Sequence, residues 1–159
     1  MASEDAFIAA KSVFMLFYGY VGAVAREIGQ EKAEALMAET CNFAGTMHGA
    51  MTKEQLGIKE PNAKTAWSMA KQAKDNLGAD YEVIEESAQR VVTKNRRCPM
   101  YEAAHDLGMD TAAIEKRCLL GPMGFMAAAV KQLNPDIELR VRKFRSGPDD
   151  FCEEEISIP

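Results

Sequence analysis

The sequence predicts an α+β protein: an N-terminal helical hairpin plus a third helix, then two antiparallel β-hairpins that form a sheet, with helices between them. Two observations support this. Apolar residues repeat at three- and four-residue spacing through residues 1–78, whereas two later segments alternate with a period of two. Helices segregated from antiparallel strands are typical of the α+β class. The 159 residues suit one domain, with a helical half (1–78) and a sheet-containing half (79–159).

Three helices are predicted in the first half. Ser3 is placed to cap the first helix, which should end near Gly29. The second should follow at once and end before Gly57, and the third should run from Pro61 to Gly78. The expected inner stripe of the second helix is Ala33, Met37, Cys41, Ala44, His48 and Met51.

The second half should contain two hairpins and the helices that separate them. Residues 81–86 and 90–97 form the first predicted hairpin, and "DIELRVRKF" and "FCEEEISI" form the second around the turn "SGPDD". A helix should begin at Pro99, and another should be capped by Asp110. The Gly121-Pro122 pair should break the helix that follows.

Each predicted hairpin pairs an acidic strand with a basic strand. Opposite charges across strands stabilise the strand register and are typical of a solvated sheet face. The alternative is that a few of the arginines bind a carboxylate ligand in a bidentate manner.

Composition indicates which partners the protein should bind and in which compartment it should occur. The net charge of −5 does not favour nucleic acid, because phosphate binding needs clustered positive charge. The acidic N-terminus does not resemble an export signal, so the four cysteines predict a reducing, cytoplasmic environment. The apolar run at residues 13–25 is shorter than a membrane span, so we expect a buried helix and no membrane. Because this helix is apolar almost all round, it could form the contact of a homodimer.

Cys98 is the cysteine whose local sequence favours reactivity. It precedes Pro99 and should therefore occupy the N-cap of a helix, where the helix dipole lowers a thiol pKa. Arg97 adds positive charge. His105 shares a helix face with Tyr101, but it lies seven residues from the cysteine, a rise of about 10 Å, which is too far for a direct hydrogen bond.

Two further cysteines should point toward the same region. Cys118 lies on the Ile114 face of its helix, and Cys152 alternates with Ile156 on the apolar face of its strand. Three converging thiols could supply a nucleophile with supporting groups, or bind zinc or an iron–sulfur cluster. They could equally be buried thiols that only pack.

The second half resembles the L-2-amino-thiazoline-4-carboxylic acid hydrolase family and, more distantly, the 4-vinyl reductase-like domain. The resemblance lies in the succession "Arg97-Cys98-Pro99... Tyr101-Glu102... Gly108-Met109... Glu115... Cys118... Asn134-Pro135... Phe144... Gly147... Cys152". It covers residues 80–158, and the helical half fits loosely.

The resemblance implies a cysteine-bearing pocket between sheet and helices that takes a small-molecule ligand. It implies hydrolysis of a small, carboxylated, sulfur-containing ring, with a non-enzymatic small-molecule, metal or iron–sulfur binding module as the alternative. Cys98, Cys118 and Cys152 would then be catalytic residues or metal ligands. The predicted substrate-binding residues are Arg97, Arg142, Tyr101 and His105.

Overall fold

The computed structural model describes residues 4–158 and confirms the α+β class. The predicted N-cap Ser3 lies outside these residues. The helical half comprises α1 (Glu4–Ile28), α2 (Gln30–Leu56) and α3 (Ala63–Asn76). The other half comprises β1 (Asp80–Glu86), β2 (Arg90–Arg97), α4 (Pro99–Asp106), α5 (Thr111–Leu120), α6 (Pro122–Lys131), β3 (Glu138–Lys143) and β4 (Cys152–Ser157).

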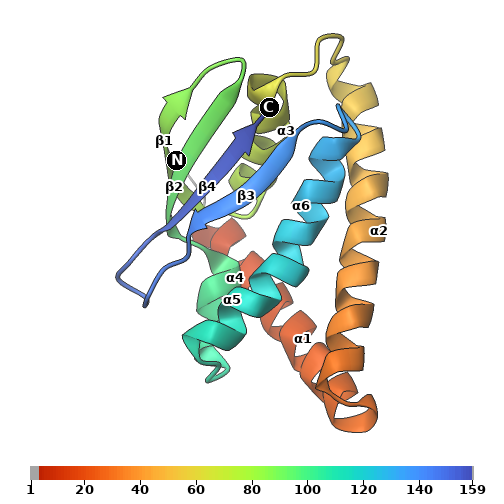
Figure 1. Ribbon diagram of the computed structural model, residues 1–159. Helices are drawn as coiled ribbons and strands as arrows, with labels where there is room; N and C mark the ends of the chain where they lie inside the picture. The colour runs from red at the N-terminus through yellow and green to blue at the C-terminus, as the bar shows by residue number, and fades with distance from the viewer. Residues whose placement is uncertain (1–3, 159) are drawn as a thin grey trace.

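The four strands form one antiparallel sheet in the order β1-β2-β4-β3. The two predicted hairpins are therefore joined through β2 and β4, with Val91 opposite Ile156. The helices lie on one side of this sheet, and within the described residues no helix covers the other side (Figure 1).

Two clusters of buried side chains hold the layers together. The larger cluster joins the inner face of the sheet to α3 and α6, and includes Trp67, Met69, Val91, Val130 and Ile156. The smaller cluster joins α1, α4 and α5, and includes Tyr18, Tyr101 and Ile114. Period-two alternation decides which strand residues reach the larger cluster, because successive side chains point to opposite faces.

Helix boundaries follow local capping chemistry. Asp110 accepts a hydrogen bond from the Ala113 backbone N–H, which confirms the predicted cap of α5. Helix α3 begins at Ala63 and not at Pro61, because Asn62 and Thr65 exchange side-chain and backbone hydrogen bonds in a capping box. The predicted break at Gly121 separates α5 from α6.

Helices α2 and α6 pack with their backbones in close contact. An added Cβ at Gly45 would overlap the Phe125 carbonyl, and one at Gly49 would overlap the Ala129 carbonyl. Both glycines are buried on the inner stripe of α2. The predicted stripe residues Ala44 and Met51 are instead exposed. A pattern of apolar side chains does not predict the two glycines, because glycine has no side chain.

Much of α1 and α2 faces outward with large apolar side chains. Leu16 and Tyr20 on α1 are 76% and 67% exposed, and Phe43 on α2 is 70% exposed. By length and composition α1 could cross a membrane, and only 22% of its most apolar window is buried. The expectation of a short, buried apolar run is therefore wrong for this helix. Dimerisation through α1 stays a prediction.

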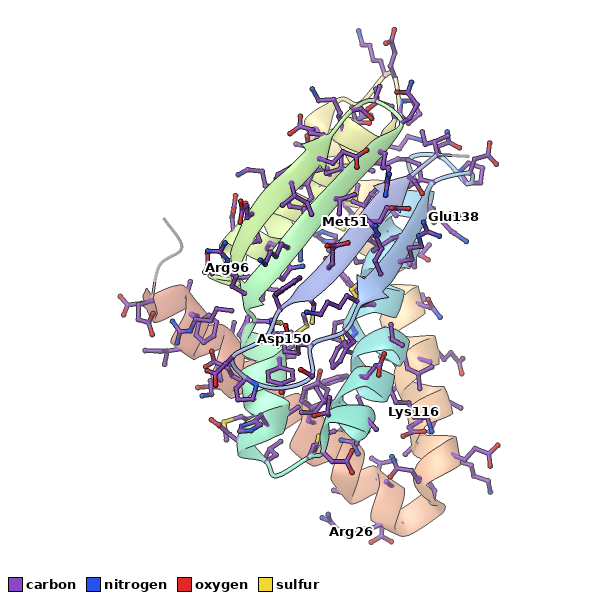
Figure 2. The ribbon with its side chains drawn as sticks, turned by 60° about the vertical axis from the view of Figure 1, so that its left-hand side comes forward. Arg26, Met51, Arg96, Lys116, Glu138 and Asp150 are labelled. Atoms are coloured by element: carbon purple, nitrogen blue, oxygen red, sulfur yellow. The ribbon has the colours of Figure 1, made fainter. Side chains whose placement is uncertain are left out.

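The outer face of the sheet carries the expected ion pairs. Arg96 pairs with Glu82 at 2.7 Å, and Lys143 pairs with Asp150 at 2.6 Å beside the turn between β3 and β4 (Figure 2). Glu155 is an exception, because it is 2% exposed beneath the side chains of arginines from β2 and β3. Its burial disfavours ionisation, but hydrogen bonds from these arginines outweigh it and hold the pKa of Glu155 below its usual value.

Candidate functional site

A cavity of about 470 Å³, which we call the main cavity, lies between the helical layer and the sheet. Its volume falls within the range of about 300–1,000 Å³ that is typical of small-molecule sites. All helices except α5 and all strands except β1 contribute to its walls. The lining is mostly apolar and includes Phe14, Phe17, Trp67, Met123, Phe125 and Met126.

One ion pair interrupts this apolar lining. Lys74 Nζ lies 2.8 Å from Glu154 Oε2, and both side chains are largely buried. The same ammonium group donates to Asn95 Oδ1 at 2.8 Å. Helix α3 supplies the lysine, while Asn95 and Glu154 come from the inner faces of β2 and β4. The ion pair therefore fixes α3 to the middle of the sheet.

A second, small cavity of about 40 Å³ lies beside the first, and Lys74 and Glu154 line both. Such a volume holds one or a few water molecules, since a water needs at least about 10–15 Å³ by this measure. Cys98, Cys118 and Cys152 all line the small cavity, so the structure brings the three predicted thiols together. Their roles stay predictions.

The prediction that the position of Cys98 lowers its pKa is wrong. Cys98 does occupy the N-cap of α4. Burial is the largest influence on its pKa, and it outweighs the Tyr101 backbone N–H and the charges of Lys74 and Arg145, so the pKa is raised. Burial, followed by the proximity of Cys98, also raises the pKa of Cys118 well above its usual value. At neutral pH both groups are therefore thiols, which can donate weak hydrogen bonds.

Arg145 is the most deeply buried cation at the small cavity, and it is 2% exposed. It donates to the backbone carbonyls of Asn95 at 2.9 Å and Arg96 at 3.0 Å, and its Nε lies 3.4 Å from Cys152 Sγ. Its guanidinium carbon lies 4.6 Å from the ring centre of Tyr101. The segment after β3 is thereby held against α4.

The predicted substrate-binding residues lie in different environments. Tyr101 is buried and lines the small cavity. Arg97 also lines it, but its guanidinium already binds Glu4 at 2.7 Å and Glu102 at 3.0 Å. Arg142 lies on the outer face of the sheet, paired with Glu153 at 3.1 Å. His105 is half-exposed and stacks on Tyr101 outside both cavities.

No histidine stands beside the three thiols. His48, on the predicted inner stripe of α2, lines the main cavity together with Cys41, and its Nε2 lies 3.4 Å from Thr52 Oγ1. Burial raises the pKa of Cys41. Neither His48 nor His105 lines the small cavity, so neither is placed as a base for Cys98.

The arrangement of donors does not suit a metal ion. Within residues 4–158 no group of three or more histidine, cysteine, aspartate or glutamate side chains could hold one. The three thiols line one cavity without forming a set of ligands. We therefore derive no step through zinc or an iron–sulfur cluster.

Sequence reasoning missed four polar residues at this site: Lys74, Asn95, Arg145 and Glu154. The alternation that places Cys152 and Ile156 inward also places Glu154 inward. The sequence therefore predicts an inward Glu154, but its two acidic neighbours make it resemble part of a solvated face. Pairing of β2 with β4 sets Asn95 opposite Cys152, which no local pattern reveals.

Comparisons with known proteins place the chain in a family. The family model for L-2-amino-thiazoline-4-carboxylic acid hydrolase matches residues 10–153. A search of curated proteins gives no match.

A solved structure, the trafficking protein particle complex subunit 3 from Naegleria fowleri covalently bound to palmitic acid, shares the fold. Its TM-score is 0.63 at 15% sequence identity, and the match covers 96% of each chain. At that identity the likeness establishes the fold alone. The family model, in contrast, spans most of the sequence and includes all three cysteines, and on this basis the chain belongs to the L-2-amino-thiazoline-4-carboxylic acid hydrolase family.

Proposed function

We propose that the protein binds a small molecule whose apolar body occupies the main cavity. The observation that carries this proposal is the cavity of about 470 Å³ with an almost wholly apolar lining. Burying apolar ligand surface there would contribute about 25 cal/mol per Å² removed from water. A strongly polar ligand would gain little from these walls and would lose its own hydration.

Two further features favour such a ligand. The polar groups of the main cavity include the Lys74–Glu154 ion pair, so a ligand would meet apolar walls along most of its length and charges at one place. The trafficking protein particle complex subunit 3, described as covalently bound to palmitic acid, is a protein of this fold that carries an apolar chain. The proposal for the present chain rests on its own cavity.

Trp67 provides a direct test, because it is the single tryptophan of the chain and it lines the main cavity. We expect primary alcohols from hexanol to dodecanol to change its fluorescence in a saturable manner. Affinity should rise about fourfold per added methylene until the cavity is full, because each buried methylene contributes about 0.8 kcal/mol.

A matched pair of variants on α3 provides the control. Ala73 lines the main cavity, whereas its neighbour Gln72 is exposed and does not. Ala73→Phe should abolish alcohol binding, and Gln72→Phe should leave it unchanged. Equal effects of the two variants would contradict the proposal. An affinity that does not depend on the chain length of the alcohol would also contradict it.

Family membership favours a second candidate function, hydrolysis of a thiazoline carboxylate by the thiols beside the small cavity. Cys98 Sγ would add to the ring carbon that lies between nitrogen and sulfur, and the ring carbon–sulfur bond would break, with the ring sulfur taking up the thiol proton. Water would then displace Cys98 from that carbon, which releases N-carbamoyl-cysteine and restores the free thiol. Because the pKa of Cys98 is raised from 9.0, the thiolate fraction and therefore kcat/KM should still be increasing at pH 9.

Replacement of this thiol separates the two functions. For a catalytic Cys98, Cys98→Ser should lower turnover of 2-aminothiazoline-4-carboxylate by about a hundredfold or more, the lower end for a positioned catalytic group. Cys41→Ser is the control, because Cys41 lines the main cavity and not the small one. Unchanged turnover in Cys98→Ser would falsify the catalytic role.

A further inference from the structure

Arg145 is a buried cation without an acidic partner. It is 2% exposed, and among residues 4–158 no carboxylate oxygen lies within 4.0 Å of its nitrogen atoms. Its hydrogen bonds go to two backbone carbonyls and to the sulfur of Cys152. An ion buried without an opposite charge is unfavourable, so this position favours an anion nearby.

Asn95 supplies an independent observation at the same place. The residue is 3% exposed, and its Oδ1 accepts a hydrogen bond from Lys74. Its Nδ2 is a buried nitrogen without a hydrogen-bond partner, the one such side-chain atom within the described residues. Asn95 lines the small cavity, and a buried donor left unpaired there calls for an acceptor from outside the chain.

The charges around the small cavity also favour a bound anion. Three cations line it, and two of them have acidic partners: Arg97 binds Glu4 and Glu102, and Lys74 binds Glu154. Glu154 is the single acidic residue among the described lining residues, and Lys74 neutralises it. Arg145 is left as one uncompensated positive charge.

We propose that the small cavity binds the carboxylate of the ligand, with Asn95 Nδ2 and Arg145 as the groups that recognise it. This inference rests on the proposed function, since the body of the ligand would occupy the main cavity. Lys74 and Glu154 line both cavities and so mark where the head group passes from one to the other. The volume of about 40 Å³ is sufficient for a group the size of a carboxylate. The bound ligand would be a monocarboxylate with an apolar tail.

The test compares two ligands of equal chain length, decanoate and 1-decanol, at pH 7.5, with Trp67 fluorescence as the readout. Asn95→Asp keeps the shape of the side chain and an acceptor for Lys74, but replaces the donor with a negative charge. We expect it to weaken decanoate binding at least about tenfold, the effect of losing one hydrogen bond to a charged group, and to leave decanol binding within about twofold.

Asn42→Asp is the matched control. Asn42 is exposed on α2 and lines neither cavity, so the same chemical change there should leave decanoate binding nearly unchanged. Circular dichroism and a urea midpoint check that each variant folds. If Asn95→Asp does not fold, Asn95→Ala removes the same donor without adding a charge, and it should give a smaller but still decanoate-selective loss.

The outcomes separate this inference from the proposed function. If both ligands bind and Asn95→Asp weakens them equally or not at all, the carboxylate site is wrong while the main cavity still binds apolar molecules. A selective loss of the same size in Asn42→Asp would show that added negative charge weakens decanoate binding from any position, and would also overturn the inference. If the wild-type protein binds neither ligand, the proposed function fails and the inference fails with it.

Discussion

At the scale of single residues, burial decides the chemistry of the site. A helix N-terminus favours a thiolate, yet Cys98 has a raised pKa because desolvation outweighs the Tyr101 N–H and the nearby cations. Tyr18, which also lines the small cavity, has its pKa raised by burial and secondarily by the cysteines around it. The site is therefore composed of neutral thiols and a phenol beside fixed cations.

This burial predicts a loss of stability at alkaline pH. Folded Cys118 and Tyr18 hold their protons more tightly than the unfolded chain does, so the unfolded chain loses protons first as pH rises above about 8.5. In that window the unfolded state binds fewer protons, and the free energy of unfolding must fall. Urea titrations at pH 8 and pH 10.5 should show a decrease of at least about 1 kcal/mol.

A variant without one of these thiols checks the cause. Cys118→Ala should be less stable at pH 8 because it leaves a cavity, but its stability should fall less steeply with pH than that of the wild type. Equal slopes for the two proteins would show that Cys118 does not titrate in this window.

At the scale of elements, the contact between α2 and α6 determines the wall of the main cavity. Both helices contribute lining residues, including His48 and Phe125, whose ring centres lie 5.3 Å apart. Gly45 and Gly49 permit this approach, because any side chain there would overlap the backbone of α6.

We expect Gly49→Ala to destabilise the protein by about 1–3 kcal/mol, the usual range for overpacking, after the gain in helix propensity is included. Gly19→Ala is the control, because an added Cβ there meets nothing within 4 Å. It should be neutral or stabilise α1 by up to about 1 kcal/mol. Urea unfolding of both variants measures the difference, and a loss of stability in Gly19→Ala equal to that in Gly49→Ala would contradict the packing argument.

At the scale of the whole molecule, the sequence predicts the helices and strands but not the cavities between them. Periodicity and caps predicted the order of helices and strands, and alternation placed Cys152 on the inner face beside the other two thiols. The main cavity depends on how far α2, α3 and the sheet stand apart, which no local pattern encodes. Arg145 follows a basic run along β3, so the sequence alone predicts a solvated charge there. Its burial arises from contacts with β2 and α4, which no local pattern encodes.

The Lys74–Glu154 ion pair lines two cavities of different character. The larger is apolar and lies between helices and sheet, and the smaller is lined by thiols, an unpaired amide donor and an unpaired buried cation. Together they predict a ligand with an apolar body and an anionic head.

The most direct test of this account is a crystal structure of the protein with decanoate bound. We expect the alkyl chain to lie in the main cavity against Trp67, with a carboxylate oxygen within hydrogen-bond distance of Asn95 Nδ2 and the guanidinium of Arg145 beside it. A decanoate bound only at the surface, or one whose carboxylate points away from the small cavity, would contradict it.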